Sequence, residues 1–249
     1  MSLIRKIKES IITKWIVLYY TFFFILGSYL LLQLLFTVLQ FFFFGDPQQS
    51  ITLQGFNVVI DGIDFQIWDL PEFHISIILS SLFVIGLTWF TMKLVMKGSP
   101  FRNIGFLPVR REHRIWFLYS VLVLCGGILL REYVIGSTEI SISANNDVEK
   151  LLIILGLAFF GPVLEEVLFR GYLQSRMDVI LKDGYPWISI IITAVLFSGF
   201  HFQYAPLEML YIFGIGVFLS LMKHKTGSLW FPIIFHVAGN LYAVLMILL

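Results

Sequence analysis

Charged residues and cysteine are both scarce in this chain of 249 residues. Only 13% of the residues are Asp, Glu, Lys or Arg, while 58% are hydrophobic and the mean hydropathy is +0.88. Soluble domains carry about 25% charged residues, so this composition excludes an ordinary soluble domain. Cys125 is the single cysteine. An intramolecular disulfide and a cysteine-based metal site are therefore also excluded.

The chain also lacks a repeat of fixed period and a low-complexity linker, and no charge interrupts the run between Lys14 and Asp46. That run is too long for a removable signal peptide, so we expect a retained anchor. The sequence predicts an all-α, polytopic bundle of about seven transmembrane helices, and residues 1–249 form a single integral membrane domain. The predicted spans are 14–44, 73–96, 115–130, 148–177, 187–202, 207–222 and 229–249.

Basic residues are absent from 46–72, where the loop is acidic. By the positive-inside rule this loop is predicted to lie outside, the N-terminus in the cytoplasm and Leu249 outside. Residues 48–70 contain short β-prone stretches between glycines and predict a small hairpin. The compact single chain favours a bacterial cell membrane. Basic residues cluster at the ends predicted to lie in the cytoplasm: Arg5, Lys6, Lys8 and Lys14 before the first span, Lys93, Lys97, Arg102, Arg110, Arg111 and Arg114 in one loop, and Lys223 and Lys225 in another.

These basic loops are explained by topology and by contact with the anionic lipid bilayer, so we expect no nucleic-acid partner. The polar residues inside the predicted spans need a different explanation. Glu165 and Glu166 interrupt an apolar run from 151 to 171. One ionisable side chain near the bilayer centre costs about 2.5 to 3.5 kcal/mol, so an adjacent pair indicates a functional site.

Downstream residues can meet this pair. Glu165 and His201 are equally far along the chain from Asp183, where Asp-Gly favours a reversal, so antiparallel helices would place the two side chains at the same depth. His236 and Asn240 are four residues apart and share one helical face. Gly171 and Gly199 would permit close helix approach.

The spacing also suggests different roles for the two glutamates. Glu166 and Arg170 form an i, i+4 pair, so Arg170 can neutralise Glu166. Glu165, on the neighbouring face, can then point toward the histidines. Two structural alternatives stay open. Both carboxylates can belong to an ion-pair network, and Asn240 can make an interhelical hydrogen bond.

A carboxylate, two imidazoles and a carboxamide can activate water and stabilise an oxyanion. Glu165 would act as general base, while His201, His236 or Asn240 polarises the carbonyl or binds a metal that does so. Ser198 lies on a different helical face from His201, which disfavours a serine nucleophile.

Three motifs follow one another along the chain: Glu165-Glu166-x-x-x-Arg170-Gly171, Phe197-x-x-x-His201 and His236-x-x-x-Asn240. Together they resemble the CAAX-protease and bacteriocin-processing family of intramembrane proteases, which includes prenyl-protein endopeptidases. The resemblance covers 151–249. The predicted catalytic core is 148–249, and 14–130 would form three accessory spans.

The resemblance implies an intramembrane endopeptidase acting on a peptide or membrane-protein substrate. It implies that Glu165 and His201 activate water, while His236 and Asn240 bind metal or form the oxyanion hole. Zn²⁺ held by His201 and His236 and a metal-free mechanism both stay open. Two rival functions are a noncatalytic bacteriocin-immunity or scaffold protein of the same fold, and a proton-coupled transporter. The transporter would be expected to show internal repeats, which this sequence lacks.

Overall fold

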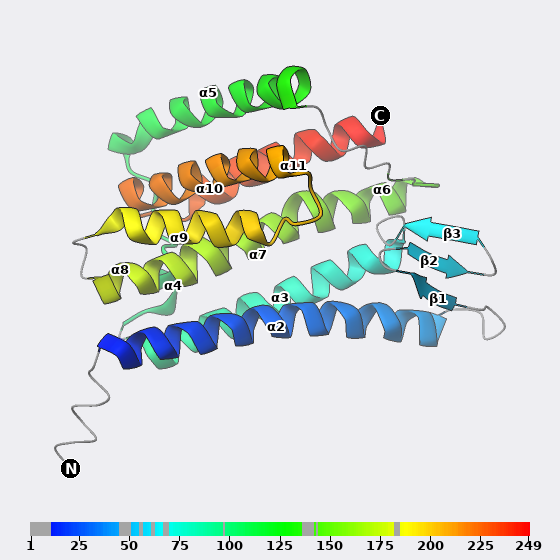
Figure 1. The fold of residues 1–249 in the computed structure, drawn as a ribbon, viewed down its shortest axis with the longest axis horizontal. Helices are drawn as coiled ribbons and strands as arrows, with labels where there is room; N and C mark the ends of the chain where they lie inside the picture. The colour runs from blue at the N-terminus through cyan, green and yellow to red at the C-terminus, as the bar shows by residue number, and fades with distance from the viewer. Residues whose placement is uncertain are drawn as a thin grey trace, which may run out of the picture. The chain divides into compact units, whose positions relative to one another are not determined.

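The chain folds as a helical membrane bundle, as predicted. A computed structural model describes residues 11–44, 51–54, 57–60, 63–66, 70–96, 98–135, 142, 144–181 and 185–249. The predicted reversal at Asp183 and Gly184 and the basic residues before 11 lie outside these ranges. Figure 1 shows the order of the elements along the chain. The helices are α2 (Ile11–Phe44), α3 (Pro71–Val95), α4 (Pro100–Ile104), α5 (Arg114–Leu130), α6 (Asp147–Ile153), α7 (Gly161–Glu166), α8 (Ser175–Leu181), α9 (Pro186–Gly199), α10 (Pro206–Thr226) and α11 (Trp230–Leu248).

Short helical segments of other types complete the set. A 3₁₀ turn, η2 (Arg111–His113), precedes α5, and a π-helical turn, η3 (Arg131–Ile135), follows it. Two longer π-helical segments, η4 (Ile154–Phe160) and η5 (Val167–Gln174), lie on either side of α7. The helix from Asp147 to Leu181 is therefore continuous, but its hydrogen-bond pattern changes before and after the two glutamates. The hydrophobic pattern of the sequence does not predict these changes.

Six helices in the described ranges are long and apolar enough to cross a membrane, and they match six of the predicted spans. The remaining predicted span, 187–202, differs. It is α9, an apolar helix of 14 residues, about 21 Å long, whereas the hydrocarbon core is about 30 Å thick. A turn that includes His201 ends α9, and Pro206 then begins α10.

The predicted hairpin in the 48–70 loop is a small antiparallel sheet. Its strands are β1 (Ile51–Gln54), β2 (Asn57–Ile60) and β3 (Ile63–Gln66), in the order β1-β2-β3. Ile60 lies opposite Ile51 on one side and opposite Ile63 on the other. The β-prone stretches were thus identified correctly, and the sheet has one more strand than a simple hairpin.

The chain divides into two compact units. Unit 1 comprises Met1–Ile25, Ile85–Glu139 and Glu165–His236, and unit 2 comprises Leu26–Val84, Ile140–Leu164 and Val237–Leu249. Each unit contains residues from the predicted accessory spans, 14–130, and from the predicted catalytic core, 148–249. Unit 2 has its own core of Ile142, Ile153, Ala158 and Val244.

Two loops predicted to lie on the same side of the membrane are joined in unit 1. The Leu229 N–H donates to Gly105 O at 2.7 Å, and the Ser228 hydroxyl donates to Leu107 O at 2.8 Å. Gly105 has φ +103° and Gly227 has φ +66°, a left-handed conformation that favours glycine. These bonds hold the loops at the same end of unit 1.

Glycines also set helix spacing in unit 1. A Cβ at Gly171 would lie 2.6 Å from Ile104 Cγ2, so the predicted close approach at Gly171 is confirmed. At Gly199 a Cβ would meet nothing within 4 Å, so the same prediction for Gly199 is wrong. Gly216 on α10 permits the close approach to α9 instead, because a Cβ at this position would lie 3.3 Å from Ala194.

Candidate active site

Five of the six residues singled out from the sequence meet in unit 1. Glu165 and Glu166 end α7, Arg170 follows on η5, His201 lies just after α9, and His236 lies on α11. The Nε2 atoms of His201 and His236 lie 3.9 and 3.8 Å from Glu165 Oε2. The expected convergence of α9 and the glutamate-bearing helix is therefore observed.

Glu166 and Arg170 form a fully buried ion pair. Arg170 Nη1 donates to Glu166 Oε1 at 2.9 Å, and both side chains are 0% exposed. Arg170 Nη2 donates to Gly216 O at 3.1 Å, and its guanidinium lies 4.2 Å from the centre of the Phe197 ring. A charge buried this deeply is tolerated when it is paired and hydrogen-bonded. The pairing predicted from the i, i+4 spacing is present.

His236 lies between the two glutamates. Its Nδ1 contacts Glu166 Oε1 at 2.8 Å, while its Nε2 faces Glu165. The predicted separation, with only Glu165 facing the histidines, is thus incomplete. A carboxylate accepts hydrogen bonds, so Nδ1 carries the proton in this contact. In the neutral imidazole, Nε2 then presents a lone pair toward Glu165.

In His201, as in His236, Nδ1 is the protonated ring nitrogen. Its Nδ1 lies 2.7 Å from Phe197 O, and because a carbonyl only accepts, Nδ1 is again the protonated nitrogen. The Phe197 ring packs on the imidazole with centroids 4.8 Å apart. His201 Nε2 therefore also presents a lone pair toward Glu165 Oε2, a buried atom without a hydrogen-bond partner in the described ranges.

Three acceptors thus surround one small space: Glu165 Oε2 and the two Nε2 atoms. The separations of 3.8 and 3.9 Å are too long for direct hydrogen bonds. A water molecule between them could donate to the carboxylate and to one imidazole. Two histidines and a glutamate are also a ligand set typical of catalytic zinc. By spacing, however, the described residues include no group of three or more His, Cys, Asp or Glu that could hold a metal ion.

Tyr204 is a neighbour of the site that the sequence analysis missed. Its ring stacks on His201 at 6.1 Å with an interplanar angle of 19°. Burial raises the pKa of the Tyr204 phenol, an effect that the positive charge of Arg131 opposes. The only sequence signal was an aromatic residue three positions after His201, which is common in apolar chains.

Asn240 lies one turn beyond His236 on α11 and belongs to unit 2. Its side-chain amide donates to Leu157 O on η4 at 3.1 Å. The structural alternative considered from the sequence, a hydrogen bond to a neighbouring helical segment, is therefore present. The Ser198 hydroxyl donates to Met209 O at 2.6 Å.

Part of the chain is similar to known proteins. Residues 147–242 match the family model described as Type II CAAX prenyl endopeptidase Rce1-like. An Escherichia coli protein named "Uncharacterized 24.3 kDa protein" is 28% identical over 99 residues, which cover 38% of this chain and 44% of that protein. The match thus spans less than half of the relative's length. No solved structure matches the chain.

The matched segment begins with α6, ends within α11 and contains all three motifs. Together with the six apolar helices it identifies an integral, multi-pass membrane protein. Residues 147–242 are therefore similar to the Type II CAAX prenyl endopeptidase Rce1-like family.

Proposed function

We propose that the protein is an intramembrane endopeptidase that hydrolyses peptide bonds with water activated by Glu165. The observation that carries this proposal is the meeting of Glu165 Oε2 with the Nε2 atoms of His201 and His236 at 3.9 and 3.8 Å. Three acceptors around one point suit a molecule that donates protons, and water is both that donor and the reactant of hydrolysis.

Glu165 is the base in this scheme. It removes a proton from water as the water oxygen attacks the carbonyl carbon of the scissile bond, and it returns the proton to the leaving amine nitrogen. The second hydrogen of the water is accepted by the Nε2 atom of His201 or His236, which orients the water. Glu166, paired with Arg170, fixes the tautomer and direction of His236 through the 2.8 Å contact to Nδ1. We assign oxyanion stabilisation to the Asn240 amide on the basis of the family resemblance alone.

Zinc is a second way to activate the water. When bound, it would polarise the carbonyl and lower the pKa of a coordinated water. Glu165, His201 and His236 have the right donor types, but their spacing does not fit a metal ion. We therefore assign no step of the mechanism to zinc and propose a metal-free reaction.

The substrate is proposed to be a peptide or membrane protein that approaches from the bilayer. Purified full-length protein in detergent or vesicles should cleave at least one member of a panel of prenylated and unprenylated membrane-anchored peptides. Glu165→Gln should remove the cleavage, and mass spectrometry of the products would locate the cut. If wild type and Glu165→Gln behave alike across the panel, the enzymatic proposal fails and a noncatalytic role replaces it.

A further inference from the structure

The helix that carries the glutamates has a second set of polar residues beyond the active site. Arg170, Gln174 and Asp178 follow Glu166 at intervals of four residues and lead toward the end of α8. Across from them, Gly216, Ser220 and Lys223 lie on α10. We refer to Glu166 together with these six residues as the polar ladder. All seven belong to unit 1.

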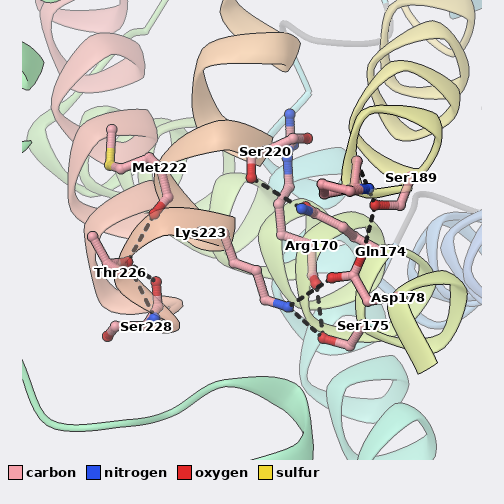
Figure 2. A network of polar contacts seen from close by, with 11 residues as sticks. Arg170, Gln174, Ser175, Asp178, Ser189, Ser220, Met222, Lys223, Thr226 and Ser228 are labelled. Carbon is pink, nitrogen blue, oxygen red and sulfur yellow. Dashed lines mark hydrogen bonds and ion pairs between the residues drawn. The ribbon is translucent and has the colours of Figure 1, made fainter. Parts of the chain in front are cut away.

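Direct contacts join the two sides of the ladder. After the bond from Arg170 to Gly216 O, Gln174 Nε2 donates to Ser220 O at 2.9 Å. Lys223 Nζ then donates to Ser175 Oγ at 2.7 Å and lies 4.0 Å from Asp178. Figure 2 shows these side chains facing one another between the two helices. Polar contacts therefore continue from the active site to the end of α10.

Burial changes along this path. Glu166, Arg170, Gln174 and Ser220 are 0% exposed, whereas the side chains of Lys223 and Asp178 are 10% and 17% exposed. Lys223 lies in the last turn of α10, at the end predicted to face the cytoplasm. The ladder thus leads from a fully buried ion pair to side chains that are partly exposed.

Three atoms within the ladder have no hydrogen-bond partner among the residues that the structure describes: Arg170 Nε, Gln174 Oε1 and Ser220 Oγ. Leaving buried polar groups unpaired is costly, and such groups usually bind ordered water. The three atoms comprise a donor, an acceptor and a hydroxyl that can be either. A buried water needs two to four polar partners, which this set offers.

We propose that the polar ladder binds ordered water between Arg170, Gln174 and Ser220 and supplies the active site with water from the Asp178–Lys223 end. The supply role rests on the proposed hydrolysis, which consumes one water per bond cut in a region where lipid holds none. The hydration itself does not depend on catalysis. The two parts can therefore be tested separately.

Hydroxyl-radical labelling with X-ray pulses tests the hydration on full-length protein in detergent. Phe197 is 2% exposed and lies against the Arg170 guanidinium, and Phe22 is 1% exposed and packs on the rings of Phe23 and Phe169. Radicals formed from bound water should oxidise Phe197 several times faster than Phe22. Ser220→Ala should lower the Phe197 rate toward that of Phe22, and Ser220→Thr should retain it. Equal rates for the two rings in wild type would overturn the proposal.

Turnover tests the supply role. Ser220→Ala should lower kcat several-fold with KM and Tm unchanged, because the hydroxyl it removes bonds to no described protein group. Ser81 supplies the matched control, since its hydroxyl in unit 2 is equally buried and equally without a described partner. Ser81→Ala should leave kcat unchanged. A Ser220→Ala variant with full kcat would overturn the supply role. Absence of any cleavage by wild type would refute the proposed function while leaving the labelling result intact.

Discussion

His236 is the residue that joins the buried ion pair to the space beside Glu165. One ring nitrogen contacts Glu166 and the other faces Glu165. The charge on Glu166 therefore does two things: it compensates Arg170, and it sets which nitrogen of His236 carries the proton. The i, i+4 spacing predicted the first function. The second depends on the position of α11, which the motif spacing does not encode.

The two glutamates should respond differently to loss of charge. Glu165→Gln should abolish cleavage and leave the Tm near that of wild type, because the Glu165 side chain is 32% exposed and makes no close ion pair. Glu166→Gln and Arg170→Ala should lower activity and also cost about 3 to 5 kcal/mol of stability, because each leaves a buried charge unpaired. Thermal unfolding and peptide cleavage measure both effects.

Glu112→Gln is a control for this experiment, because Glu112 is 66% exposed and its ion pair with Arg110 is also at the surface. It should change neither Tm nor activity. Three active-site variants with equal losses of activity and unchanged Tm would contradict the assigned roles.

Metal content tests the chemistry at the same residues. Since the proposed reaction assigns no step to a metal ion, we expect purified active protein to contain far less than one equivalent of zinc and to resist prolonged chelation. His236→Ala should still lower kcat about 10² to 10⁴-fold, through loss of water orientation. Two results together would replace this mechanism with a metal-dependent one. Wild-type protein would contain one equivalent of zinc that His236→Ala loses together with its activity. Chelation would remove turnover from wild-type protein, and added zinc would restore it.

Among the elements, the apolar helices were predicted well because lipid imposes a simple rule on length and composition. α9 was the exception. Its apolar stretch continues through Phe202, but the helix ends at Gly199 before a turn that carries His201. Hydropathy depends only on which residues are present, so it does not predict that this turn directs the His201 imidazole toward Glu165. The π-helical segments were missed for a similar reason, because a shift from i, i+4 to i, i+5 bonding leaves no mark in hydrophobic periodicity.

Close packing between η5 and α4 gives a prediction at this scale. Gly171→Ala should destabilise the protein by about 1 to 3 kcal/mol, because the new Cβ would lie 2.6 Å from Ile104 Cγ2. Gly199→Ala has open space around it and should be neutral or slightly stabilising. Ile104→Ala should reduce the penalty of Gly171→Ala in the double variant. Thermal melting of the four proteins checks this, and equal melting of Gly171→Ala and Gly199→Ala would disprove the contact.

For the whole molecule, charge asymmetry predicts which ends face the cytoplasm. In a Cys125→Ser background, Arg111→Cys should be labelled by impermeant thiol reagents only from inside, and Asp64→Cys on β3 only from outside. Gln203→Cys, in the turn after α9, tests whether this short helix crosses. Labelling of Gln203→Cys from outside supports seven crossings. Labelling of Arg111→Cys and Asp64→Cys from the same side would overturn the topology.

The π-helical segment η5, Val167–Gln174, follows the two glutamates directly and carries Arg170 and Gln174 of the polar ladder. Its N–H groups bond to carbonyls five residues back, so each π turn accommodates one more residue than an α turn. Loss of one residue in this segment could therefore be absorbed by a return to α-helical bonding, which would keep Asp178 close to its present face of the helix. The spacing between the glutamates and the far end of the ladder can thus change by one residue without separating the two ends of the path.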